Sequence, residues 1–472
     1  MKLLQTIYID IFNETFKLTG RINQNIREWI VKISIFLLMA EYFVLTILTL
    51  RGIVDFYVID ATKIGTFFLV LVCIFSVNEP LKYIKWNKWI AYPYFAAATY
   101  MTLMSIDHFT GRCYQAYALQ MLLVFPALYF IWGNRKDYTK YFDWIAKSLI
   151  IIGTVTTICT FIFAPVTEKT LIGNANQYIG LTFNPNRLGT LTIMIIAACL
   201  YLISKRDKWA IFYMVLSGIN TGFTIMSESR AAILVVIFQM VAFIVILMRL
   251  DFVKAKIKTS VFILLSIGIV IVSVSVTEFT LNQIGNPPTS VKSATTDNSI
   301  VYSDSINNTS QQEVSRFSTK GKSLDDFSSG RIEIWKWYLE RMHIRGNDCT
   351  NHEVVYGNGS VVHNAHNTFL EIPFRFGIPA GIFYALFMIG VIVVLIKSAI
   401  IKGSRRYVIF IVMASLAYFI EAMLDVMTLP FERGPVLLFY MSLVGIFEGD
   451  IYAIDDSIGK NKRTIKHNYD LV

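Results

Sequence analysis

The sequence has little charge for its length. Only 16% of its 472 residues are Asp, Glu, Lys or Arg, whereas 55% are hydrophobic, and this balance excludes an ordinary soluble domain. Its five cysteines are an odd number, and Cys73, Cys159 and Cys199 fall inside apolar stretches, so no disulfide framework is expected. The net charge of +10 comes from Lys and Arg clusters between apolar runs, which indicates membrane anchoring and argues against nucleic acid as a partner.

Several motifs that carry enzyme chemistry are missing. The sequence has no Gly-rich phosphate loop with a lysine, no HExxH, no paired CxxC and no GxSxG, so the usual nucleotide, zinc and serine-hydrolase classes lack their residues. No Asp-x-Asp pair is present to hold a divalent metal for a nucleotide-sugar enzyme. We therefore expect no metal and no cofactor, and any group transfer would manage anionic phosphates with Arg and Lys alone.

Long apolar runs fill most of the chain. Each has roughly the length of about 20 residues that a helix needs to cross a bilayer, and unpaired backbone groups are too costly in lipid for such runs to cross as loops or open strands. The sequence predicts an all-α polytopic membrane protein with twelve transmembrane helices. The runs, of which the first contains Glu41, cover residues 31–50, 64–78, 89–106, 113–134, 148–167, 188–204, 209–227, 231–248, 259–277, 376–396, 407–420 and 434–447.

The basic residues predict the orientation of these helices. Of 43 Lys and Arg residues, 27 lie in the N-terminus, the C-terminus and the even-numbered connections, and 7 lie in the short odd-numbered connections. Because basic residues near helix ends are retained in the cytoplasm, both termini should be cytoplasmic and the long connection between helices nine and ten should face outward. The predicted segments are a membrane bundle 1–278, an extracytoplasmic loop 279–365, membrane helices 366–448 and a cytoplasmic tail 449–472.

The last part of the long loop has a helical pattern. Within residues 329–343, the apolar residues Ile332, Trp335, Leu339 and Met342 recur at helical spacing, behind a serine that suits the N-cap position. This predicts an amphipathic helix that lies over the outer face of the membrane, with these four residues on its apolar face.

Histidines gather on the predicted outer side, which holds five of the six. His363 and His366 stand three residues apart in VVHNAHNTFLEIPFRFG, and Asn367 follows. In a helix this spacing would put both imidazoles on one face, and a group with an ordinary pKa of about 6.5 can accept a proton near neutral pH. A polar lid on helix ten or a weak two-ligand metal site would use the same residues.

Three arginines lie at predicted outer ends of helices. Arg331 begins the loop helix, where a cation is unfavourable unless it holds an anion such as phosphate. Arg230 stands at the edge of helix eight beside Glu228 in FTIMSESRAAIL, where ionisable groups usually face a cavity or a partner. Arg187 follows Asn186 in the turn GLTFNPNRLG. A solvated Arg331 and a structural pair of Glu228 with Arg230 are the alternatives.

Four segments together resemble one family. GLTFNPNRLG, SESRAAIL, SGRIEIWKW and HNAHNTFLEIPFRFGIPAG occur in the order seen in the O-antigen ligase and O-antigen polymerase superfamily, and the resemblance covers residues from about 180 to 390. It implies that Arg230 and Arg331 hold a diphosphate and that His366 is the catalytic residue, with His363 as its neighbour. Arg187 is a further candidate for binding the diphosphate, although it stands where many relatives have a small or apolar residue. Weaker candidates for substrate binding are Glu228, Asn186 and Asn367.

The resemblance also implies a function. Members of this family are metal-independent glycosyltransferases that move a glycan from a polyisoprenyl diphosphate, here an undecaprenyl-diphosphate-linked oligosaccharide, on the outer face of the bacterial cytoplasmic membrane. The expected activity is an inverting polymerase of lipid-linked repeat units for O-antigen or capsule, and the pathway would supply a chain-length regulator and a flippase as partners beside the membrane lipids. Ligase-type transfer to another acceptor and a glycolipid flippase or other transporter are the alternatives.

Overall fold

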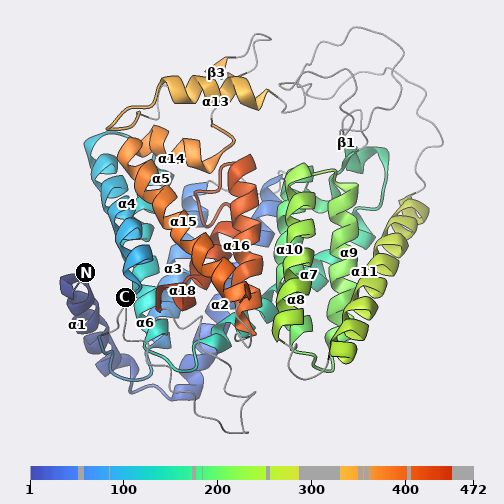
Figure 1. Ribbon diagram of the computed structural model, residues 1–472, viewed down its shortest axis with the longest axis horizontal. Helices are drawn as coiled ribbons and strands as arrows, with labels where there is room; N and C mark the ends of the chain where they lie inside the picture. Colours follow the sequence, from blue (N-terminus) through green and yellow to red (C-terminus); the bar gives the residue numbers. More distant parts are fainter. Residues whose placement is uncertain are drawn as a thin grey trace.

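The protein is an α-helical bundle with two small pairs of antiparallel strands. The computed structural model describes residues 2–50, 58–83, 86–172, 177–182, 184–250, 256–285, 330–348, 354–355, 361–362, 364–400 and 406–448. Most of the long helices run between the two ends of the bundle, and α13 lies across one end (Figure 1). The helices are α1 (Lys2–Thr19), α2 (Gln24–Leu50), α3 (Val58–Ser76), α4 (Lys88–Asp107), α5 (Arg112–Leu119), α6 (Phe125–Gly133), α7 (Thr139–Phe163), α8 (Pro185–Ser204), α9 (Ala210–Met226), α10 (Arg230–Leu250), α11 (Lys256–Gly285), α13 (Arg331–Glu340), α14 (Thr368–Phe376), α15 (Ile378–Ile400), α16 (Tyr407–Leu424), α17 (Gly434–Ser442) and α18 (Val444–Glu448).

Short irregular pieces complete the fold. A π-helical turn joins α5 to α6, so that these three elements form one apolar stretch, and two 3-10 turns flank the first strand pair. Strand β1 pairs with β2 and β3 pairs with β4, both antiparallel, with Leu171 opposite Tyr178 and Val354 opposite Val362. The elements are η1 (Gln120–Val124), η2 (Glu168–Thr170), η3 (Gly180–Thr182), β1 (Leu171–Ile172), β2 (Gln177–Tyr178), β3 (Val354–Val355) and β4 (Val361–Val362).

Many of the helices are membrane spans by length and composition. Each of the twelve predicted runs lies largely on helix, and eight helical stretches in the described ranges are long and apolar enough to cross a bilayer. The chain is therefore a multi-pass membrane protein. The eight stretches are Ile59–Ser76, Arg112–Gly133, Thr139–Phe163, Pro185–Ser204, Arg230–Arg249, Thr259–Ile284, Ile378–Ser398 and Tyr407–Leu424, and two shorter apolar stretches are Ala210–Met226 and Gly434–Phe447.

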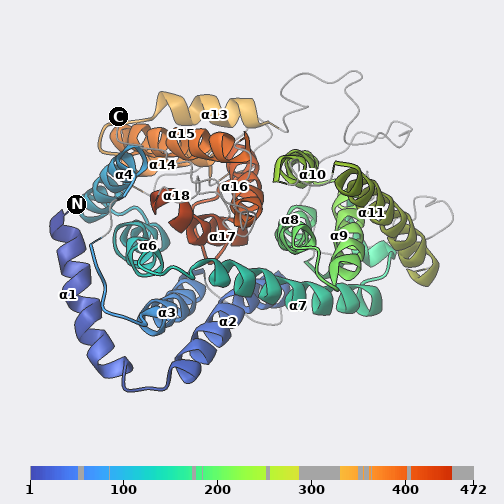
Figure 2. The same ribbon diagram turned by 60° about the horizontal axis from the view of Figure 1, so that its bottom comes forward.

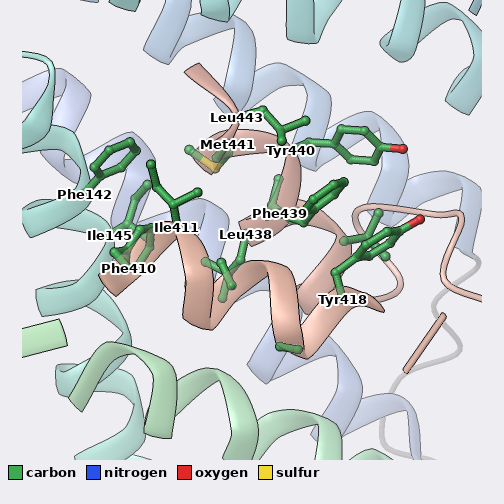
Figure 3. Close-up of a cluster of buried hydrophobic side chains, with 14 of the residues drawn as sticks. Phe142, Ile145, Phe410, Ile411, Tyr418, Leu438, Phe439, Tyr440, Met441 and Leu443 are labelled. Carbon is green, nitrogen blue, oxygen red and sulfur yellow. The ribbon is translucent and has the colours of Figure 1, made fainter. Parts of the chain in front are cut away.

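Aromatic packing joins the N-terminal and C-terminal membrane helices in one core. The rings of Tyr418 and Phe439 stack with their centroids 4.3 Å apart, and Phe142 of α7 stacks on Phe410 of α16 at 5.3 Å (Figure 3). Helix α7 packs against both α2 and α8, and it runs along one side of the bundle (Figure 2). Because the helices of 366–448 pack among those of 1–278, the two predicted membrane segments form a single packed unit.

The N-terminal residues form a helix that the charge pattern did not predict. Helix α1 packs against α3 and α6, and its buried Tyr8 donates a hydrogen bond to the carbonyl of Leu123, 2.8 Å away, in the π-helical turn. The first predicted apolar run begins at residue 31, so α1 lies outside the predicted helices. A tyrosine that satisfies a distant backbone carbonyl leaves no periodic signal in the sequence.

The loop helix lies within the predicted range 329–343, and one of its faces packs on protein. Helix α13 begins at Arg331 after Gly330, whose backbone is left-handed with φ of 75° and which occupies the N-cap position. Ile334 and Tyr338 are buried, and the ring of Tyr338 packs on Phe374 of α14 with 4.4 Å between the centroids. Leu339, one of the four apolar residues predicted to lie over the membrane, is 56% exposed, and its contact with lipid stays a prediction.

Two glycines bring α9 and α11 into close contact. A Cβ atom added at Gly218 would lie 2.5 Å from Cβ of Ser273, and one at Gly222 would lie 3.2 Å from Cβ of Thr277. Glycines four residues apart on one helix face allow two backbones to approach closely in a membrane. Helix α11 depends on this seam because α9 is its main packing partner.

Enlarging this seam should destabilise the protein. Replacing Gly218 by leucine is expected to cost about 1 to 3 kcal/mol or more, because the added side chain overpacks the interface. Gly268→Leu is the matched control, since a Cβ there meets no described atom within 4 Å. Thermal unfolding in detergent should show a lower midpoint for Gly218→Leu and a near-wild-type midpoint for Gly268→Leu. Equal midpoints would contradict close packing of α9 on α11.

Candidate functional site

A buried loop between α16 and α17 forms the floor of the candidate site. Residues 425–433 leave the helical conformation between two membrane helices, yet Met427 and Thr428 are fully buried. Protein therefore surrounds this irregular backbone. Gly65 of α3 makes room for the loop, because a Cβ there would lie 2.1 Å from the ring of Phe431.

Asp425 joins a histidine and an arginine at the beginning of this loop. Its Oδ1 lies 3.4 Å from Nδ1 of His366, and its Oδ2 lies 3.1 Å from Nη1 of Arg433. Burial alone would raise the pKa of Asp425, but Arg433, the hydrogen bond with His366 and the amide of Val426 together hold that pKa well below its usual range. Asp425 is therefore a carboxylate, and its bond to Nδ1 leaves Nε2 of His366 for another partner.

His366 lies in a tight turn, not on a helix. Helix α14 begins only at Thr368, and the backbone of His366 is left-handed with φ of 46°. The argument that a helix places His363 and His366 on one face was therefore wrong for His366, and His363 lies outside the described residues. Asn367, a weaker candidate for substrate binding, is the N-cap of α14, where its Oδ1 accepts the amide hydrogens of the next two residues.

Arg187 reaches the same loop from the beginning of α8. Asn184 caps this helix and Pro185 takes its first position, which accounts for the predicted turn. The Nη1 of Arg187 donates to the carbonyl of Glu432 at 3.0 Å, and its Nη2 lies 2.9 Å from Glu432 Oε1. Asn186 is exposed beside it. The Arg187 guanidinium therefore holds the residue next to Arg433.

Glu421 is the point at which these groups meet. This buried carboxyl of α16 lies within electrostatic reach of Arg187, Arg331 and Arg433, and also of Asp425. The beginning of α13 therefore lies near Glu421, and Trp335 of the same helix donates a hydrogen bond to the carbonyl of Ala365, next to His366. The structure gathers three of the predicted site residues, Arg187, Arg331 and His366, although they are far apart in the sequence.

Arg230 begins a neighbouring helix at the same end of the bundle. A Cβ at Gly189 of α8 would lie 2.6 Å from Cβ of Ala232 and 3.1 Å from Cβ of Ser229, so the beginning of α10 packs closely on the first turns of α8. Glu228 occupies the turn before α10 with a left-handed backbone, φ 50°. The close approach brings the beginning of α10, which carries Arg230, beside the beginning of α8, which carries Arg187.

Four charged residues of the site were not predicted to be part of it. No sequence motif contains Glu421, Asp425, Glu432 or Arg433. The available signal was the segment DVMTLPFERG, which puts three charges and a proline between two apolar runs. In the described ranges no group of three or more His, Cys, Asp or Glu side chains is placed to hold a metal ion.

Comparison with known proteins leaves the function to be argued from this geometry. No protein-family model, no curated protein and no solved structure matches the chain. The site offers a histidine oriented by a carboxylate and several guanidinium groups. These groups suit acceptance of a proton next to an anionic leaving group.

Proposed function

We propose that this protein is a glycosyltransferase of the O-antigen polymerase type, which transfers glycan from an undecaprenyl-diphosphate-linked oligosaccharide to a sugar hydroxyl at the outer face of the cytoplasmic membrane. The observation that carries the proposal is the meeting of His366, Asp425 and Arg433 with Arg187 and Arg331 around one buried loop. The four sequence segments that resemble the O-antigen ligase and polymerase superfamily support it.

The proposed mechanism is a single displacement. Nε2 of His366 accepts the proton of the acceptor hydroxyl, whose oxygen bonds to the anomeric carbon of the donor sugar while the bond from that carbon to the diphosphate oxygen breaks. Asp425 holds the imidazole through Nδ1 and stabilises its charged form, as the aspartate of a Ser-His-Asp triad does. Arg331, Arg187 and Arg230 receive the charge of the departing diphosphate. The anomeric carbon is inverted and no metal takes part.

The proposal includes twelve spans with both termini in the cytoplasm, so that α13 and the site face outward. In a cysteine-free background, Glu340→Cys on α13 should react with an impermeant thiol reagent in intact cells, because the Glu340 side chain is 70% exposed. Lys136→Cys, at an exposed position in a predicted cytoplasmic connection, is the matched control and should react only after lysis. The opposite pattern would overturn the orientation and with it the proposed site of reaction.

Reconstitution tests the reaction itself. The purified protein in liposomes with lipid-linked repeat units as both donor and acceptor should yield a ladder of longer lipid-linked glycans. Transfer only to an added lipid A core or protein acceptor would indicate the ligase activity. Movement of glycolipid between leaflets without a new glycosidic bond would indicate a flippase and overturn the proposal.

A further inference from the structure

The turn that carries His366 is held from two sides. Its left-handed backbone is strained for a residue with a side chain, and such a conformation persists only where the surroundings impose it. The N–H of Ala365 donates to Oε2 of Glu371 at 2.8 Å, and the carbonyl of Ala365 accepts from Nε1 of Trp335 at 3.0 Å. Both backbone groups of the residue before His366 are thus fixed by side chains of two different helices.

Glu371 is a built part of the interior. Its side chain has no exposed surface, its Oε1 accepts a hydrogen bond from Arg375, and the hydroxyl of Tyr114 lies 3.3 Å from the same oxygen. The guanidinium of Arg375 also lies over the ring of Tyr114 at 4.0 Å. A buried carboxylate that keeps one oxygen for its ion pair and the other for a single backbone N–H has a fixed position.

Trp335 makes the second bond from the helix that begins with Arg331. It belongs to α13, which is seated on α14 by the contact of Tyr338 with Phe374. The bond of Trp335 to Ala365 therefore ties the predicted phosphate-binding helix to the turn of His366. An indole N–H is a single directional donor. The substitution Trp335→Phe therefore removes the hydrogen bond to Ala365 but keeps an aromatic side chain at this position.

We propose that Glu371 and Trp335 are positioning residues that hold Ala365 from opposite sides and so keep the imidazole of His366 against Asp425. This inference rests on the proposed function, in which His366 accepts the proton. Neither residue touches the reacting atoms, so their loss should act on turnover through His366. Binding of the lipid-linked donor should change little.

The two bonds that hold Ala365, from Glu371 and Trp335, are called the clamp. The chemical reactivity of His366 tests this clamp without any assumption about activity. Carbethoxylation of His366, followed by mass spectrometry in the purified full-length protein, is compared with that of the exposed His343. In Trp335→Phe and Glu371→Gln the ratio of His366 modification to His343 modification should rise several-fold, because the imidazole of His366 is released from Asp425. Trp337→Phe is the matched control: Trp337 lies on the same helix and contacts Phe374, and its substitution should leave the ratio unchanged.

Kinetics provide the second readout. Trp335→Phe should lower kcat by about 10-fold to 100-fold, the effect of misplacing a reacting group by about 1 Å, with KM for the donor within about twofold of wild type. In a His366→Ala background it should cause no further loss. Trp335→Phe keeps the test valid if Glu371→Gln fails to fold because it leaves Arg375 buried without its partner.

The outcomes separate the two proposals. Unchanged His366 reactivity in Trp335→Phe and in folded Glu371→Gln would overturn the clamp, as would a further loss of turnover in the His366→Ala background. A wild-type protein that forms no glycosidic bond would overturn the proposed function, while the reactivity ratios would still decide whether Glu371 and Trp335 hold the turn.

Discussion

Replacing His366 by alanine is expected to lower the rate of glycan transfer by about 100-fold to 10,000-fold, the usual cost of losing a positioned general base. The variant should insert and fold, because the His366 side chain is 36% exposed and its one described side-chain contact is to Asp425. Binding of the lipid diphosphate should remain, since the arginines that would hold it are unchanged. The measurement is single-turnover transfer in liposomes, with donor binding measured separately.

Two further histidine variants provide the comparison. His343→Ala, at an exposed position, should keep wild-type activity, and His363→Ala should keep part of it, as a neighbour of the catalytic residue would. If His366→Ala transfers glycan at the wild-type rate at equal expression, the assignment of the proton acceptor is wrong and stabilisation of the leaving group alone would have to account for the reaction.

Replacing Asp425 by asparagine should have an effect nearly as large, roughly 100-fold to 10,000-fold, because a carboxamide cannot stabilise the charged imidazole and can present the wrong tautomer. Arg433 would also lose the carboxylate that, against the effect of its own burial, keeps its pKa above the usual value. Asp107→Asn is the control, since Asp107 pairs with the exposed Arg345 and surface pairs contribute little. An active Asp425→Asn enzyme would contradict the orienting role.

The low pKa of Asp425 gives the sign of its pH dependence. The pKa of Asp425 is lower in the folded protein than the value of about 3.9 expected for an unfolded Asp. Ionised Asp425 therefore stabilises the fold fully at any pH above about 3.9. This stabilisation is lost only as the pH falls through the lowered pKa. Between pH 5 and 8, as an approximate range, Asp425 therefore does not titrate. The free energy of unfolding that wild type gains over Asp425→Asn should therefore persist across this range in denaturation measurements, and its disappearance at the acidic end of the range would contradict a permanently ionised Asp425.

The sequence predicts the helices better than the site. Apolar runs of membrane length locate the spans because lipid imposes the same requirement on every such segment. The orientation of α13 could not be predicted, since its partner face on α14 is set by Tyr338 and Phe374 from distant parts of the chain. The helix start at Asn184 was visible as a turn because capping is a local effect.

The candidate site shows the same division between local and distant information. His366 and Arg331 are recognisable as residues of a motif, but the left-handed turn at His366 depends on the clamp at Ala365. Asp425 and Arg433 carry no motif, and only the fold shows that they meet His366. Ion pairs between elements have no fixed spacing in the sequence, so such partners appear only once the helices are packed.

The pair of Arg187 with Glu432 has a consequence for selectivity. Arg187 already has a carboxylate counter-ion, with 2.9 Å between Nη2 and Oε1, so an anion that approaches its guanidinium competes with Glu432 for an occupied position. A phospholipid phosphodiester carries a single negative charge and gains little from that exchange, whereas a diphosphate brings more charge and more acceptor oxygens. With the proposed diphosphate donor, the internal carboxylate would thereby discriminate against the bulk lipids of the membrane, which are present in large excess.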